Sequence, residues 1–351
     1  MIMLRAASKS MNCSLGNAKK AKEDEFYTQL KDIEMELKHY RQHFEGKVVY
    51  CNCDDPRVSN FFYFFSFNFK KYGLKKLIAT CYQNKEVGSP SAPVVEYTGD
   101  DEIGVKSLKG DGDFRSEEAI ELLKQADIVV TNPPFSLFRE YVAQLIQYDK
   151  KFLILGNQNQ VATNEIAHLI TEGKLWQGNY SGDMAFRVPS YYEPRETRYW
   201  EDEAGQKWRS LGTGCWYTNL DFAKRREELI LFKAFDPKTY PKYVNYDAIE
   251  VGTYKNIPTD YAGPMGLPIT ALAKLSPDQF DIIGFSGTLA RPMAEVVPGA
   301  SGSGRFYLDL GNGKYKRMYD RVVIRNNRVD MDKLHDMVQS DTNSRVAYGT
   351  E

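Results

Sequence analysis

The sequence is poor in the residues that mark disulfide-rich, metal-binding or membrane-spanning proteins. Its 351 residues include 5 cysteines and 4 histidines, and the cysteines show no regular framework. Cys51 and Cys53 lack a second pair at zinc spacing, so we expect no metal site. The chain has no apolar run of about 18 residues that could span a membrane, and no signal peptide is evident. We therefore expect a reduced, cytoplasmic protein without a membrane partner.

The chain also lacks an excess of positive or negative charge. The formal net charge is −1, which excludes a globally basic protein, so any surface for nucleic acid must be local. Hydrophobic residues make up 42% of the chain, enough for one large catalytic domain and a second lobe. The 23 tyrosines and 19 phenylalanines can fill cores, and exposed rings can also stack on bases.

Short apolar runs alternate with helical patterns in the first half of the chain. Apolar residues at helical spacing from Tyr27 to Phe44 predict a helix that ends at Gly46. Further helices are expected at about 59–73, at 117–125 with Ser116 as its cap, and through Tyr141. The expected strands are 47–51, 77–80, 94–97, 128–130 and 152–155, and 184–188 and 215–218 could complete their sheet. This alternation predicts an α/β fold with a parallel, doubly wound sheet covered by helices on both faces.

The pattern changes after about residue 175, which suggests three regions. Residues 1–22 are polar and lysine-bearing and predict a flexible arm. Residues 23–222 would form the catalytic domain, with a basic and aromatic insertion at about 189–212. The loop-rich residues 223–351 would form a region that recognises the target.

The tetrapeptide Asn132-Pro133-Pro134-Phe135 is the most specific motif of the chain. It directly follows the expected strand 128–130, at the edge of an open α/β sheet where ligands bind. An Asn carbonyl and a backbone carbonyl can accept both hydrogens of an exocyclic amine, which localises the nitrogen lone pair for methyl transfer. The prolines stiffen the loop, and Phe135 can stack on a base taken out of a duplex. An Asn-Pro pair can also be a simple turn, but its place after a strand favours the catalytic interpretation.

Three other segments could bind a nucleotide-like cofactor, although each has an ordinary structural alternative. Asn52 and Asp54 follow the first strand, but such residues also favour helix caps, and the usual Gly-x-Gly is missing. Asp113 could accept a hydrogen bond from an amino group while Phe114 stacks on an adenine. By itself, this pair is typical of a surface turn. The segment Phe26-Tyr27-Thr28 could close over the cofactor or could form a hydrophobic staple.

Two regions combine basic and aromatic residues and could contact nucleic acid. Arginine and lysine bind phosphates or guanine edges, and aromatic rings can stack or wedge, whereas a solvated charged loop is the alternative. The candidate residues are Arg195, Arg198, Lys207 and Arg209 in the insertion, and Lys314 and Arg317 in the C-terminal region.

These motifs occur in the same order as in a known family. The sequence resembles the EcoRI-type adenine-specific DNA methyltransferases, the modification half of restriction–modification systems, from about Lys22 to about Asn327. The similarity is carried by residues 24–29, 52–56, 111–115, 132–135, 216–221, 266–270 and 277–280.

The resemblance implies a Rossmann-like methyltransferase that uses S-adenosylmethionine to methylate adenine N6 in double-stranded DNA by base flipping. It implies that Asn132 and Pro133 bind the target amine and that Phe135 stacks on the target base. The cofactor would be held at its methionine end by Phe26, Tyr27 and Thr28, at the first-strand turn by Asn52 and Asp54, and at its adenine by Asp113 and Phe114.

The same resemblance gives the expected partners and leaves two alternatives open. We expect a bacterial or phage-encoded monomer whose cognate restriction endonuclease, where one exists, shares the recognition site without binding the enzyme. One alternative is an RNA-base or protein-glutamine methyltransferase on the same fold. The other is a non-catalytic, DNA-binding relative.

Overall fold

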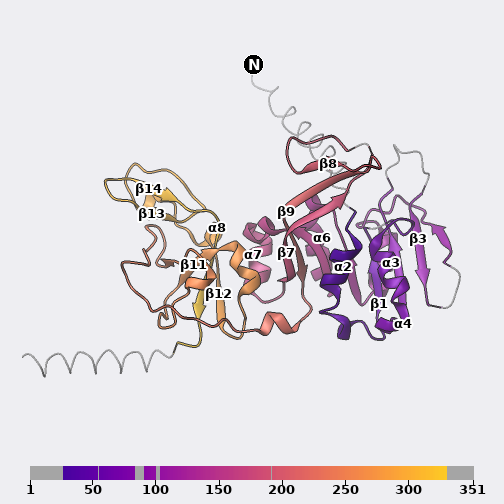
Figure 1. Cartoon of the computed structure of the whole chain (residues 1–351), viewed down its shortest axis with the longest axis horizontal. Helices are drawn as coiled ribbons and strands as arrows, with labels where there is room; N and C mark the ends of the chain where they lie inside the picture. The colour runs from indigo at the N-terminus through magenta and orange to yellow at the C-terminus, as the bar shows by residue number, and fades with distance from the viewer. Residues whose placement is uncertain (1–26, 54, 84–90, 100–102, 191, 330–351) are drawn as a thin grey trace, which may run out of the picture. The chain divides into compact units, whose positions relative to one another are not determined.

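A computed structural model describes residues 27–53, 55–83, 91–99, 103–190 and 192–329 (Figure 1). The chain divides into two compact units. The first contains the described residues up to Gln158 together with Trp176–Phe222, and the second contains Asn159–Leu175 and the described residues from Ala223 onward. The expected arm at 1–22 lies outside the described residues, as do Phe26 and Asp54.

The first unit is built on a nine-stranded sheet. Its order is β4-β3-β2-β1-β5-β6-β9-β7, with β8 paired to β9. The bounds are β1 (Val48–Cys51), β2 (Lys76–Thr80), β3 (Pro93–Tyr97), β4 (Val105–Ser107), β5 (Ile128–Thr131), β6 (Lys151–Asn157), β7 (Trp176–Arg187), β8 (Tyr199–Glu201) and β9 (Lys207–Thr218). β1, β2, β5 and β6 pair in parallel, and the other strands pair antiparallel. The α/β class is confirmed, but the sheet is mixed, since parallel pairing is confined to the four central strands.

Helices provide the crossovers that parallel strands need. The helices of this unit are α2 (Leu30–Leu37), which precedes β1, α3 (Asn60–Phe67), α4 (Phe69–Tyr72), α5 (Glu117–Gln125) and α6 (Phe138–Gln147). α3 and α4 join β1 to β2, and α6 joins β5 to β6. Ser116 caps α5 as predicted, because its hydroxyl accepts the N–H of Ala119 at 3.2 Å.

The central strands are buried on both faces, which explains why they read as continuous apolar runs. Val49 and Cys51 of β1 join a core cluster that also contains residues of α2 and α3. Tyr50 lies between them, points to the opposite face, and is also fully buried.

The helix predicted from Tyr27 to Gly46 is wrong in its extent. α2 ends at Leu37, and a short 3-10 helix, η1 (Arg41–His43), follows after a turn. Tyr27 pairs with a strand instead of starting the helix, and the turn allows both Tyr40 and Phe44 to be fully buried. The Phe-rich helix is likewise divided into α3 and α4 at Asn68.

Strands β7 and β9 continue past the body of the sheet, where β8 adds to them (Figure 1). We call residues 183–210 at this end the ribbon. At the other end of β7, the fully buried carboxylate of Glu36 accepts the backbone N–H groups of Asn179 and Tyr180 at 2.7 and 2.9 Å, and the Tyr40 hydroxyl at 2.8 Å. These bonds tie α2 to the part of β7 where its register with β9 shifts.

The second unit contains a four-stranded sheet of order β10-β11-β15-β12 and a separate hairpin, β13–β14. The strands are β10 (Ile249–Glu250), β11 (Met265–Pro268), β12 (Phe280–Phe285), β13 (Tyr307–Asp309), β14 (Tyr315–Arg317) and β15 (Arg321–Asn326), and the helices are α7 (Asn164–Thr171) and α8 (Ser286–Leu289). A buried ion pair between Arg321 and Glu250, at 2.9 Å, links β15 to β10.

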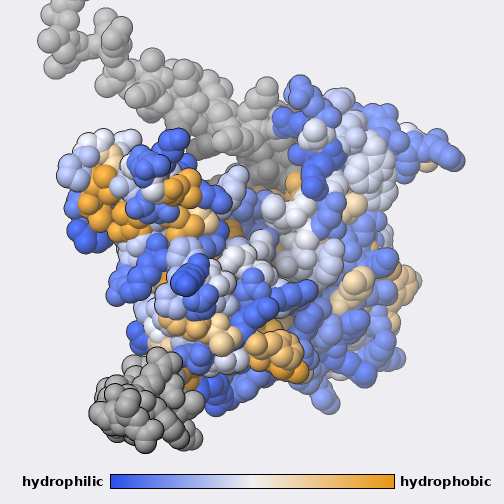
Figure 2. All heavy atoms as spheres, turned by 60° about the vertical axis from the view of Figure 1, so that its left-hand side comes forward, coloured by the Kyte–Doolittle hydropathy of each residue, from blue (hydrophilic) through white to orange (hydrophobic). Residues whose placement is uncertain are grey.

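On the face drawn in Figure 2, most residues are hydrophilic, and apolar side chains gather in separate patches. In the second unit, the exposed large hydrophobic residues are Ile230, Phe232, Leu310 and Tyr319. No helix within the described residues is long and apolar enough to cross a membrane.

Candidate active site

The carboxyl ends of the parallel strands meet at one edge of the first unit's sheet. Asn52 follows β1, Cys81 follows β2, and Asn132 follows β5. Because these strands are neighbours that run in the same direction, their following loops lie side by side. Of the candidate residues predicted from the sequence, Asn52 and residues 132–135 lie on these loops.

The Asn132–Phe135 loop is held in place at both ends. Asn132 is only 8% exposed, and its Nδ2 donates to the Thr28 hydroxyl at 3.3 Å. Pro133 is buried, and a 3-10 helix, η3 (Phe135–Leu137), begins directly after Pro134 and leads into α6. Since the amide turns its N–H toward Thr28, its carbonyl oxygen points elsewhere and can be presented to a substrate.

Hydrogen bonds connect the loop after β1 to the end of β5 and to α6. The backbone N–H of Cys53 donates to the Thr131 hydroxyl at 3.1 Å. Asn52 is 2% exposed, and its carbonyl oxygen accepts the hydroxyl of Tyr141 from α6. The Asn52 Nδ2 is buried with no hydrogen-bond partner among the residues that the structure describes. Such a donor is costly to leave unpaired, which fits a ligand that supplies an acceptor oxygen at this point.

A glycine allows the loop before α5 to pack against the end of β2. Gly112 has φ +76°, and an added Cβ would collide with the carbonyl oxygen of Cys81. The backbone N–H of Gln83 also donates to the carbonyl of Asp111 at 2.7 Å. Only glycine fits this close approach, which places Asp113 and Phe114 beside the first two strands.

Asp113 and Phe114 already have partners within the protein. Arg115 donates to both carboxylate oxygens of Asp113, at 2.6 and 2.8 Å, and these bonds lower the pKa of that carboxyl. Phe114 is 6% exposed, and its ring packs edge-on against Tyr141 with centroids 5.1 Å apart. The carboxylate is therefore ionised at neutral pH, and the ring is buried against α6.

The segment that precedes α2 lies across the same edge. The backbone of Tyr27 pairs with Arg187 at the end of β7, and its ring lies 5.0 Å from the Arg187 guanidinium. Thr28 is 3% exposed, and its backbone carbonyl accepts the Asn60 amide at 2.7 Å. Tyr27 and Thr28 thus border the Asn132 loop.

The structure adds residues that the sequence analysis missed. Tyr141, Thr131 and Asn60 hold the predicted residues in place through the hydrogen bonds described above. In the sequence, Tyr141 is one apolar position of an amphipathic helix, so nothing in the pattern indicates that its hydroxyl reaches Asn52.

The cations predicted to bind DNA differ in their surroundings. In the ribbon, Arg198 pairs with Asp183 at 2.9 Å, Lys207 donates to two backbone carbonyls, and Arg209 donates to the Thr197 carbonyl. Arg195 lies 5.9 Å from the centroid of the Tyr192 ring. These contacts hold the ribbon together.

Lys314 and Arg317 belong to the β13–β14 hairpin of the second unit. Both are exposed, and neither has an ion-pair partner among the described residues. Their charges are therefore available at the surface of that unit.

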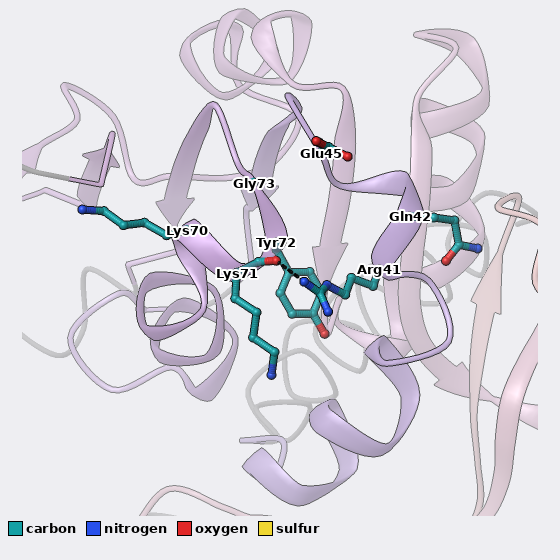
Figure 3. Close-up of a pocket in the computed structure, with 7 residues that line it drawn as sticks. All are labelled: Arg41, Gln42, Glu45, Lys70, Lys71, Tyr72 and Gly73. Carbon is teal, nitrogen blue, oxygen red and sulfur yellow. Dashed lines mark hydrogen bonds between the residues drawn. The ribbon is translucent and has the colours of Figure 1, made fainter.

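A hollow of the first unit lies at the opposite edge of the sheet. It has a volume of about 430 Å³ and is lined by residues that precede β1 and β2. Figure 3 shows the side chains of Lys70, Lys71 and Gln42 pointing away from one another, and the Arg41 guanidinium donates to the Lys71 carbonyl at 2.8 Å. Its polar groups do not converge, so it is not the candidate site.

Comparisons of the sequence with known proteins identify its family. The family described as "Adenine-specific methyltransferase EcoRI" matches residues 14–327. The Type II methyltransferase M.EcoRI of Escherichia coli is 52% identical over 296 residues, which are 80% of this chain and 91% of that protein. Type II methyltransferase M.MpnI of Mycoplasma pneumoniae is 40% identical over 88% of this chain and 96% of its own length.

A third relative, Type II methyltransferase M.MgeORF184P of Mycoplasma genitalium, is 38% identical over 89% of this chain and 98% of its own length. No solved structure matches the chain. The resemblance noted in the sequence is confirmed: the chain belongs to the EcoRI family of adenine-specific methyltransferases.

Proposed function

We propose that this enzyme transfers a methyl group from S-adenosylmethionine to adenine N6 in double-stranded DNA after flipping the base out of the helix. The observation that carries this proposal is the buried Asn132 amide at the end of β5, whose N–H is held by Thr28. The remaining Asn132 carbonyl and the backbone carbonyl of Pro133 can then accept the two hydrogens of an exocyclic amine.

The residues around the strand ends fit a nucleoside cofactor with polar substituents. The buried donor of Asn52 supports an acceptor oxygen of the ligand at the end of β1. Tyr27 and Thr28 would line its methionine end, and Asp113 and Phe114 would hold its adenine. Phe26 and Asp54 keep their predicted cofactor roles. When bound, the cofactor supplies the electrophilic methyl group.

The protein contributes position rather than a strong base. Unstacking and unpairing the adenine costs a few kcal/mol, and stacking on Phe135 returns about 1–3 kcal/mol. Asn132 and Pro133 would orient the amine so that its lone pair points at the methyl group of the bound cofactor. The N6 proton becomes acidic only after methylation and leaves in a later step, so no general base is required before transfer.

DNA would be held by both units. The ribbon, with Arg195, Arg198, Lys207 and Arg209, would follow the duplex beside the site. The exposed Lys314 and Arg317 support a target-recognition role for residues 223–351.

We also propose that the enzyme acts as a monomer. It would consist of a Rossmann-like catalytic domain and this C-terminal region. Any cognate endonuclease would share its site without forming a complex.

The experiment is incorporation of labelled methyl groups into duplex DNA, RNA and protein, followed by nucleoside analysis. We expect N6-methyladenine in DNA alone, and we expect Asn132→Ala to lose this product while still binding the cofactor. Phe135→Ala should reduce turnover, whereas Phe67→Ala should not, because Phe67 is 84% exposed on α3. If the label appears in RNA or in protein amides instead, that molecule is the substrate and the assignment to DNA is wrong. If no label is incorporated and no cofactor binds, the protein is not a methyltransferase.

A further inference from the structure

Arg187 differs from three other cations of the ribbon, Arg198, Lys207 and Arg209, in what surrounds it. It is the last residue of β7 and is half-buried. Its guanidinium lies over the Tyr27 ring at 5.0 Å, and no described carboxylate pairs with it. Arg198, Lys207 and Arg209 are instead bound to a carboxylate or to backbone carbonyls. A half-buried guanidinium that has only a ring as partner retains donors for an anion.

Backbone hydrogen bonds join Arg187 to the segment that holds the Asn132 loop. Tyr27 and Arg187 exchange two backbone hydrogen bonds, of 2.8 and 3.2 Å. The next residue, Thr28, holds the Asn132 amide. The position of Arg187 relative to the reacting edge is therefore fixed by main-chain pairing and does not depend on a flexible loop.

A cavity of about 260 Å³ opens beside this arginine. Its lining includes Tyr27, Arg187, Val58, Ser190 and Gly205. Among the described residues that line it there is no aspartate or glutamate, and the Lys207 side chain adds a second positive charge. The cavity is thus suited to a small anionic group.

We propose that Arg187 binds a backbone phosphate next to the extruded adenosine, with the Tyr27 ring holding its guanidinium in place. This inference rests on the proposed base flipping. A nucleotide that rotates out of the duplex carries its flanking phosphates toward the active site. A planar guanidinium can bind such a phosphate through two hydrogen bonds, which would favour the extruded state over the stacked state.

The test combines a protein change with a DNA change. Once the methylated adenine has been mapped, each nearby phosphate is replaced in turn by an uncharged methylphosphonate, and DNA affinity is measured. The wild-type enzyme should lose about 10- to 100-fold in affinity at one phosphate flanking the target, the range for hydrogen bonds to charged groups. Arg187→Gln should bind unmodified DNA more weakly by a similar factor and should show no further loss at that position.

Two variants serve as companions to Arg187→Gln. Arg187→Met keeps an apolar stem against the Tyr27 ring and should behave in the same way, which tests the charge without removing the packing. Lys71→Gln removes an exposed cation at the opposite edge of the sheet and should respond to the phosphonates as the wild type does. Both Arg187 variants should also lower the salt dependence of binding. The slope of log K against log salt is negative, and its magnitude should decrease by about 0.9.

The outcomes separate this inference from the proposed function. If the wild-type enzyme methylates DNA but Arg187→Gln and Arg187→Met remain sensitive to every phosphonate, the assignment of Arg187 is overturned while the function stands. If the wild-type enzyme transfers no methyl group to DNA, the proposed function itself fails.

Discussion

The hydrogen bond between Thr28 and Asn132 offers the sharpest test of how the active site is organised. Thr28→Val preserves the shape of the side chain but removes the acceptor for the Asn132 Nδ2, which lies 3.3 Å from the hydroxyl. Both residues are nearly buried, at 3% and 8% exposure, so water cannot readily replace the lost partner. Rotation of the Asn132 amide toward another acceptor then becomes favourable. Its carbonyl oxygen would leave the orientation that the target amine requires.

The size of the effect follows from the burial of the donor. Leaving a buried donor unsatisfied costs about 1–3 kcal/mol. If this cost is expressed at the transition state, turnover falls about 5- to 150-fold, since each 1.36 kcal/mol corresponds to a factor of ten. Thr28→Ser retains the hydroxyl and should recover most of the rate.

The assay is single-turnover methyl transfer to DNA, with cofactor and DNA affinities measured separately. We expect a loss in the rate of the chemical step, with DNA affinity close to that of the wild type. A Thr28→Val enzyme that folds and transfers methyl groups at the wild-type rate would refute the positioning role. A loss confined to cofactor affinity would instead assign Thr28 to the cofactor pocket alone.

Three further predictions concern the support of the site. Glu36→Gln should lower the free energy of unfolding by about 1–3 kcal/mol in urea titrations, because one of the two backbone N–H groups of β7 loses its acceptor. Gly112→Ala should weaken cofactor binding in calorimetry, because its Cβ meets the Cys81 carbonyl and its φ of +76° disfavours alanine. The pKa of Asp113 is lowered by Arg115, so this pair stabilises the fold above the ordinary carboxyl pKa of 3.8 and loses its effect as pH falls through the lowered value. Asp113→Asn should therefore remove less than about 1 kcal/mol at pH 7 and flatten the pH dependence of stability below about pH 4, since the pair is partly exposed.

Local patterns in the sequence determined the elements around the active site. Apolar runs predicted β1, β2, β5 and β6, and Ser116 predicted the start of α5. These predictions succeeded because a strand buried on both faces needs an uninterrupted apolar run, and because a helix cap depends on neighbouring residues. The Asn132–Phe135 motif was visible for the same reason, since its chemistry lies in four consecutive residues.

The tertiary structure decided the pairing of distant segments. Only the folded chain shows that Tyr27 joins Arg187 instead of α2, and that the Tyr141 hydroxyl reaches Asn52. It also decided that the sheet is mixed and that the ribbon's cations hold the ribbon together. The first two contacts join residues 160 and 89 positions apart. The sequence pattern around each partner is the same whether or not they meet. Local composition therefore specifies which groups are available, and long-range packing specifies which of them face one another.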